Sequence, residues 1–264
     1  MLNYLRAEFY KVFHRKYTWI TLLVLLALEA VLVWGFGFIN ANGSHIDVAE
    51  AAYSLWLLMY MGCFLTLFTC EMVFANQYKN GTLKNEVAFG LSRSRIYFGK
   101  YLTQLIVSIL FCAVMVLFYL GTSYLFLYRD AAEDAVLWTN TAYYLLVCLA
   151  VWIGAQALSC ACSFVCRGST SAELIAIAVL FILPEVLSMV GFVLSRQPGP
   201  GVQAAGKVCY QIYEYTPVIF LQTATTTTSA WDWGTVGRAC MIGGFWLTVP
   251  TILGLFGFHK REIH

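Results

Sequence analysis

The chain has 264 residues, of which 60% are hydrophobic and only 11% are charged, and its formal net charge is +2. A soluble domain carries about 25% charged residues, so this composition does not supply a water-facing surface. The small net charge also gives no reason to expect nucleic acid as a partner. The composition therefore indicates a membrane protein.

Apolar segments long enough to cross a bilayer as helices occur six times, since about 20 residues span the hydrocarbon core. We expect an all-α polytopic membrane protein, with one transmembrane domain over 1–264. Of the 30 charged residues (16 basic and 14 acidic), the spans contain four: Glu29, Glu71, Glu173 and Glu185. The predicted spans are 19–39, 53–75, 101–127, 141–166, 172–194 and 239–258.

Lysine and arginine are unevenly divided between the two sides of these spans. The segment before the first span, the segment between the second and third, the residue after the fourth and the tail after the sixth hold 12 of the 16 basic residues. Cytoplasmic segments carry this excess in membrane proteins. We therefore expect both termini in the cytoplasm.

The N-terminal segment 1–18 has apolar residues at helical spacing, with basic residues among the polar positions. Such a helix lies in the headgroup plane, with its cations near anionic lipid. A simple positive-inside topology signal is the alternative. The apolar residues are Leu2, Leu5, Phe9, Val12 and Phe13.

The last external loop, 195–238, opens with Pro198-Gly199-Pro200-Gly201, which cannot continue a helix. Apolar pieces too short to span follow, including 218–221, and Trp231 and Trp233 come near the end. This pattern predicts helices that re-enter or lie on the outer leaflet. A disordered polar loop is the alternative.

The cytoplasmic loop 76–100 carries turn and cap signals in close succession. Asn80-Gly81 is a turn signal, and Gly90 can end the short helix that precedes it. A short helix with apolar and basic residues suits docking into the groove of another protein. A charged topology loop is the alternative. Thr82 and Ser92 can cap the two helices, and the candidate docking residues are Leu83, Lys84, Val87, Arg93, Arg95 and Lys100.

The stretch NGTLKNEVAFGLSRSRIYFGK resembles the segment between the second and third spans of permease subunits in the bacterial type-2 ABC transporter family. The resemblance is to six-span subunits of antibiotic-peptide exporters and immunity systems. Gln77 stands where that family often has a carboxylate, so an ionic role there is not expected. The matching residues are Gly81, Thr82, Leu83, Ser92, Arg93 and Lys100.

This resemblance implies a coupling helix that sits on a separate ABC ATPase dimer, and a second permease subunit, either a second copy or a paralogue. It also implies a multi-pass protein of the bacterial plasma membrane. The sequence has no G-x-x-x-x-G-K-[ST] phosphate loop, so we expect no enzyme activity of its own and no bound cofactor. ATP and Mg²⁺ would bind through the partner ATPase.

Two carboxyl groups lie near the middle of predicted spans, Glu29 in the first and Glu185 in the fifth, beside Pro184. An ionised acid costs several kcal/mol at that depth, and no lysine or arginine lies within a span to pair with it. Each acid is either hydrogen-bonded to a neighbouring helix or faces a cavity on the substrate path. Pro184 should kink the fifth span.

Cysteine and histidine give little reason to expect chemistry. Seven of the nine cysteines fall within spans, where cysteine packs as a small apolar residue. Of Cys160, Cys162 and Cys166, the first two point about 200° apart on a helix, and no histidine lies near, so we expect no metal site. Cys209 and Cys240 lie on or near the outer side, where a disulfide is one alternative.

These observations favour the permease subunit of an ATP-driven exporter whose substrate is a peptide antibiotic or a hydrophobic compound. An ion-coupled secondary transporter that uses Glu29 and Glu185 as proton sites is a rival, although the two halves of the chain show no similarity that would indicate inverted repeats. A non-transporting membrane scaffold or sensor subunit is a third possibility.

Overall fold

The computed structural model describes residues 1–74, 77, 82–130, 134–166, 168–226 and 231–260. Six helical segments are long and apolar enough to cross a membrane, and the described residues contain no strand. The predicted all-α polytopic fold is confirmed. The six segments are α2 (Lys16–Ala41), α3 to α4 (Val48–Phe74), α6 (Arg93–Phe126), α7 (Asp134–Val165), α8 to α9 (Ser169–Ser195) and α12 (Trp233–Lys260).

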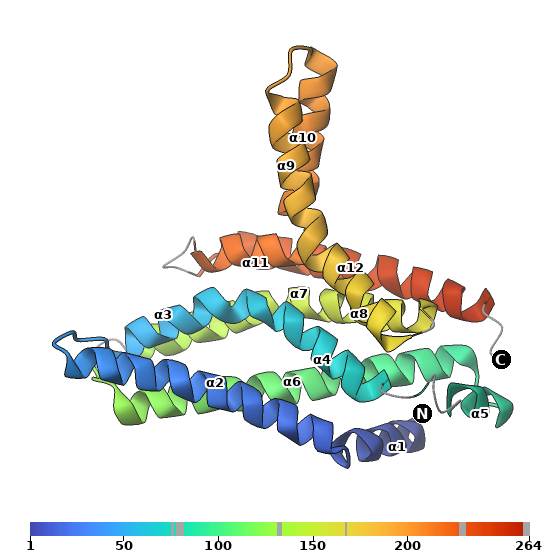
Figure 1. Cartoon of the computed structure of the whole chain (residues 1–264), viewed down its shortest axis with the longest axis horizontal. Coiled ribbons are helices and arrows are strands. Elements are labelled where there is room, and N and C mark those ends of the chain that lie inside the picture. Colours follow the sequence, from blue (N-terminus) through green and yellow to red (C-terminus); the bar gives the residue numbers. More distant parts are fainter. Residues whose placement is uncertain (75–76, 78–81, 131–133, 167, 227–230, 261–264) are drawn as a thin grey trace.

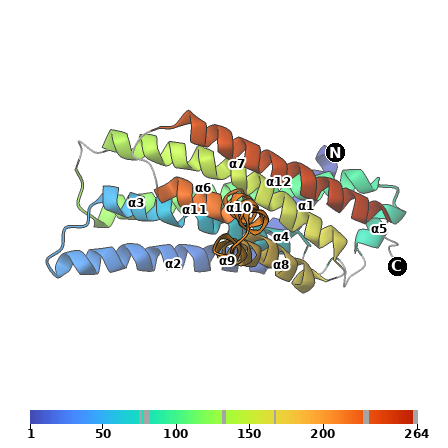
Figure 2. The ribbon, with the colours of Figure 1, turned by 90° about the horizontal axis from the view of Figure 1, so that it is seen from above.

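The segments form an elongated bundle in which α12 packs along α7, and α4 and α6 lie beside them (Figures 1 and 2). The N-terminus, the C-terminal part of α12 and the short helix α5 (Thr82–Ala88) lie at one end of the bundle (Figure 1). An even number of crossings requires the two termini to share a side.

Two of the crossing segments are interrupted. In the second, a 3₁₀ turn, η1 (Met59–Met61), separates α3 (Val48–Leu58) from α4 (Gly62–Phe74). In the fifth, the π-helical turn η2 (Ala178–Ile182) separates α8 (Ser169–Ile177) from α9 (Leu183–Ser195). Pro184 is the second residue after that turn. It has no N–H to donate, and a π-bulge accommodates the missing hydrogen bond. The chain bends there as predicted, and α9 leaves the bundle (Figure 1).

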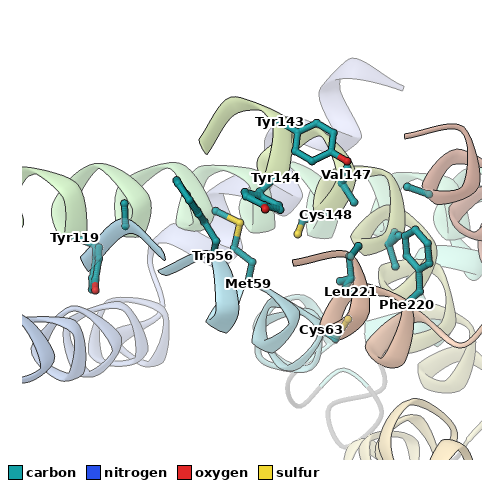
Figure 3. Close-up of a cluster of buried hydrophobic side chains, with 14 of the residues drawn as sticks. Trp56, Met59, Cys63, Tyr119, Tyr143, Tyr144, Val147, Cys148, Phe220 and Leu221 are labelled. Carbon is teal, nitrogen blue, oxygen red and sulfur yellow. The ribbon is translucent and has the colours of Figure 1, made fainter. Parts of the chain in front are cut away.

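The largest buried cluster joins α3, η1, α4, α6, α7 and α11 (Pro217–Thr226) (Figure 3). Trp56 packs against Tyr144 with ring centroids 5.1 Å apart, and its indole N–H donates to Thr141 Oγ1 at 3.0 Å. Where α4 packs on α7, the hydroxyl oxygens of Thr66 and Ser159 lie 3.1 Å apart and form a buried hydrogen bond. Such polar contacts matter between membrane helices because lipid supplies no hydrophobic force between them.

The predicted external loop contains two short helices. The Pro-Gly breaker turns the chain at Gly199, whose φ is +126°, into α10 (Pro200–Glu214). α10 packs against α9, and the two form a hairpin that projects from the side of the bundle (Figure 1). α11 instead packs on the bundle against α7, with Phe220 and Leu221 buried. The loop therefore contains one helix that projects from the bundle and one that packs on it.

Candidate functional site

The short helix α5 has well-defined ends. It begins at Thr82, whose hydroxyl donates to the carbonyl of Gln77 at 3.2 Å. Beyond its last residue, Gly90 has a φ of +84°, and its N–H donates to the carbonyl of Val87 at 3.0 Å. The N–H of Leu91 donates to the carbonyl of Glu86, and the two hydrogen bonds together form a Schellman motif. Gly90 ends the helix as predicted, whereas Asn80 and Gly81 lie outside the described residues.

The next helix, α6, starts immediately after this turn. Ser92 is its N-cap, and its hydroxyl oxygen accepts from the N–H of Arg95 at 3.4 Å, as the sequence predicts. α5 is therefore joined to a span by a turn of only a few residues.

One face of α5 packs on the bundle and the other is exposed. Leu83 is only 3% exposed and belongs to a buried cluster with Val12 of α1 (Leu2–Phe13). Leu83 packs inside the bundle in this structure, where it holds α5 in place, and its docking role stays a prediction. Lys84, Ala88 and Phe89 are exposed, Phe89 to 87%. We call Lys84, Ala88 and Phe89 the outer face of α5.

A cluster of charged groups lies beneath α5 and joins it to α1 and α6. Lys100 of α6 is completely buried, and its Nζ lies 3.2 Å from Glu8 Oε2 and 3.6 Å from Glu86 Oε1. Lys11 Nζ lies 2.6 Å from Glu8 Oε1 and 3.3 Å from Glu86 Oε1. The Tyr4 hydroxyl donates to Glu86 Oε2 at 2.9 Å. We call these five residues the charge cluster.

Burial and charged neighbours shift the pKa values of the three members that lie on α1: Tyr4, Glu8 and Lys11. Burial alone would raise the pKa of Glu8, but the ammonium groups of Lys100 and Lys11 outweigh burial and hold it below its ordinary value. Burial likewise opposes the charge of Lys11, yet contacts with Glu8 and Glu86 leave its pKa raised. Burial and the two carboxylates both raise the pKa of the Tyr4 phenol, so it remains a donor.

Close packing of α1 against α6 completes the cluster. A Cβ at Gly99 would lie 2.4 Å from the nearest ring atom of Tyr4, so only glycine leaves room for the ring at this position. The aromatic ring of Tyr4 in turn lies 5.9 Å from Lys100 Nζ. Gly99 therefore sets the position of α1 relative to the buried lysine.

Two arginines extend this arrangement to other spans. Arg93 donates to the carbonyl of Phe258 and, at 3.0 Å, to that of His259, which ties the start of α6 to the end of α12. Arg15 donates to the carbonyl of Met72 at 2.5 Å, which ties the junction of α1 and α2 to α4. By contrast, the side chain of Arg95 is exposed.

The acidic members of the charge cluster, Glu8 and Glu86, and the phenol of Tyr4 were not among the residues predicted from the sequence. A signal for Glu8 was present, because it falls in the apolar stripe of the N-terminal helix between Leu5 and Val12. An acid in such a stripe indicates a buried basic partner. No comparable signal marks Glu86, which lies on a helix of seven residues.

The structure places the two central acids in different environments. Glu29 on α2 is 9% exposed and lines a cavity of about 360 Å³. Glu185 lies in the first turn of α9, and its side chain is exposed. The two residues are not brought together in one site.

The described residues contain no group of three or more His, Cys, Asp or Glu side chains arranged to hold a metal ion. Cys160 and Cys162 are buried within the bundle. Cys209 and Cys240 are both free thiols. The alternative of a disulfide between them is therefore absent from this structure.

Comparison with known proteins places the chain in a family. No curated protein matches it. The family model described as ABC-2 family transporter protein matches residues 4–186, which run from the charge cluster in α1 to the start of α9. The match thus covers α1, α5 and the first four crossing segments. The chain belongs to the ABC-2 transporter family, as a multi-pass membrane subunit of the permease type.

Proposed function

We propose that the chain is the permease subunit of an ATP-driven exporter in a bacterial plasma membrane, and that the outer face of α5 docks on a separate ABC ATPase. The observation that carries this proposal is the charge cluster beneath α5. It connects α5, a seven-residue helix with one exposed face, to α1 and the span α6 through ion pairs that include the fully buried Lys100. A topology loop would need no such connection.

The contacts around α5 supply a route for force. Closure of an ATPase dimer would push on α5; the turn at Gly90 would transmit the displacement to α6, and Glu86 would transmit it to Lys100 and to α1 through Lys11. Arg93 would carry the same displacement to α12. Rigid, paired elements of this kind shift as units rather than deform continuously. The ATPase supplies ATP, Mg²⁺ and the energy, and this chain supplies the path.

A second permease subunit, either another copy or a paralogue, would complete the transporter. The hairpin of α9 and α10 is the surface we assign to it. Within the described residues, α9 packs mainly on α10 and η2, while large apolar side chains such as Met189 and Phe192 remain exposed. A projecting apolar hairpin with a polar tip at Arg196 and Gln197 is poorly suited to face lipid alone.

The substrate path would lie between the two subunits and would open outward when α5 moves. Glu29 and Glu185 remain the candidate path residues, and the substrate class is a peptide antibiotic or a hydrophobic compound. The rival role, ion coupling through a shared pair of acids, is disfavoured because Glu29 is buried on α2 while Glu185 is exposed on α9.

Inverted membrane vesicles that contain the chain and an ABC ATPase from the same genome test this proposal. Uptake of a substrate of the proposed class, a peptide antibiotic or a hydrophobic compound, into such vesicles should require ATP. It should persist when an ionophore collapses the ion gradients. Uptake that stops with the ionophore and ignores ATP would indicate ion coupling instead. A chain that leaves uptake at background with ATP present would indicate a scaffold or sensor subunit.

A further inference from the structure

A mostly apolar cavity of about 360 Å³ lies between α2, α3, η1, α4 and α6, with one side chain contributed by α7. This volume falls within the range of sites that hold small molecules. The α2 side contributes Glu29, the only acid in its lining. The lining also includes Met59, Cys112, Tyr119 and Trp152.

Two polar atoms of the lining are buried and have no hydrogen-bond partner among the described residues. They are Oε2 of Glu29 and the indole Nε1 of Trp152. The hydroxyl of Tyr119, by comparison, donates to the carbonyl of Ala51 at 2.9 Å and is already satisfied. Buried polar groups without partners are costly and uncommon, and the two lie on different helices, α2 and α7. Of the two, the Glu29 oxygen is the acceptor that a positively charged ligand would satisfy.

The cavity is accessible from the side of the bundle. Its outer lining includes Leu28, Leu58 and Met61, all of which are exposed apolar side chains. α2 itself is the least buried of the crossing segments, with 6% of its most apolar window buried. A ligand that dissolves in the bilayer can therefore reach Glu29 without crossing a polar surface.

We propose that this cavity binds a hydrophobic monovalent cation, with Glu29 as its counter-ion and Trp152 beside it; the proposal rests on the permease function above and names its substrate class. A carboxylate in apolar surroundings is strongly favoured by a neighbouring positive charge, because water is absent to solvate it. An aromatic ring attracts a cation through its negative face. The apolar walls hold the hydrocarbon part of the same molecule.

Binding of radiolabelled tetraphenylphosphonium to the purified chain in lipid nanodiscs tests this site. Tetraphenylborate serves as the competitor of equal shape and opposite charge. Unlabelled tetraphenylphosphonium should displace the label and tetraphenylborate should not. The Glu29→Gln variant should bind at least about tenfold more weakly, because it removes one partner of a buried charge pair.

Matched variants separate the site from general effects on the fold. Glu173→Gln, which removes another acid from a crossing segment, should bind like the unchanged chain. Trp152→Phe should weaken binding because the smaller phenyl ring attracts a cation less strongly than the indole ring does. Absence of saturable binding, equal binding by Glu29→Gln, or equal displacement by tetraphenylborate would each overturn the proposal.

The two proposals fail separately. If the cation does not bind while the chain still associates with its ATPase and supports ATP-dependent uptake, the cation site is wrong and the permease function stands. If the cation binds and no ABC ATPase associates with the chain, the cation site stands and the permease function is wrong.

Discussion

Lys100 of α6 and Glu8 of α1 form a buried ion pair, with Nζ and Oε2 separated by 3.2 Å. The two residues are 92 positions apart in the sequence. Their pairing attaches the N-terminal helix to the start of a membrane span. Because Glu86 of α5 shares the same lysine at 3.6 Å, α1, α5 and α6 form one unit.

Replacing Lys100 with methionine should lower the free energy of unfolding by up to about 3–5 kcal/mol, because the buried carboxylate of Glu8 then loses its buried partner and keeps only the partly exposed Lys11. The measurement is thermal unfolding of the purified chain in nanodiscs, followed by tryptophan fluorescence. The double variant Glu8→Gln with Lys100→Met should recover part of the loss, since no unpaired charge is left at that position. A double variant as unstable as the sum of both single variants would contradict the pairing.

A matched control for this experiment is Arg129→Met. Arg129 forms an ion pair with Asp134, but its side chain is 57% exposed. Exposed pairs contribute little to stability. The unfolding midpoint of Arg129→Met should stay at that of the unchanged chain.

Gly99→Ala should loosen α1 without disrupting α6. The added methyl would overlap the ring of Tyr4, and overpacking costs about 1–3 kcal/mol. Hydrogen exchange measured by mass spectrometry should therefore become faster across residues 2–13. Gly121→Ala is the control on the same helix, because nothing lies within 4 Å of a Cβ at that position. Equal exchange in both variants would remove Gly99 from the account.

The attachment of α1 should depend on pH in a defined window. The lowered pKa of Glu8 contributes stability above the ordinary value of 4.5, and this contribution is lost as pH falls through the pKa in the folded chain. The raised pKa of Lys11 contributes below 10.5 and is lost as pH rises through its own folded value. The distance between spin labels on α1 and α6 should increase as the pH falls below the ordinary pKa of Glu8 and through its value in the folded chain. A change centred near neutral pH would contradict this assignment.

Much of this architecture could be predicted from the sequence, because the length of apolar runs and the turn residues are local signals. The six crossing segments, the kink at Pro184, the ending at Gly90 and the cap at Ser92 are all of this kind. The charge cluster is not local. Helical periodicity gives the face on which Glu8 lies but does not identify Lys100 as its partner.

The orientation of α5 shows the same limit. The helix has seven residues, and apolar side chains lie on both sides of it. Leu83 is on the buried face, and Phe89, one residue beyond the end of the helix, is exposed. Periodicity over two turns cannot decide which face packs on the bundle. The structure decides it by burying Leu83 in a cluster that includes Val12 of α1, which is distant in sequence.

The α9–α10 hairpin should contact a second permease subunit. A photoreactive phenylalanine analogue at Met189, which is 71% exposed on α9, should give a covalent dimer on irradiation of native membranes. The same analogue at Met241, an exposed methionine of α12, is the control and should give mainly monomer. Equal dimer yields from the two positions would argue against the hairpin as the interface.

The central claim, that the outer face of α5 docks on an ATPase, is tested most directly by co-purification after co-expression with an ABC ATPase from the same genome. The double variant Lys84→Glu with Phe89→Asp should recover at least about tenfold less ATPase, because it places charge on the exposed docking surface without touching Leu83. Tyr128→Asp, an exposed aromatic residue between α6 and α7, is the control and should recover the normal amount. Normal recovery with the double variant would contradict the account.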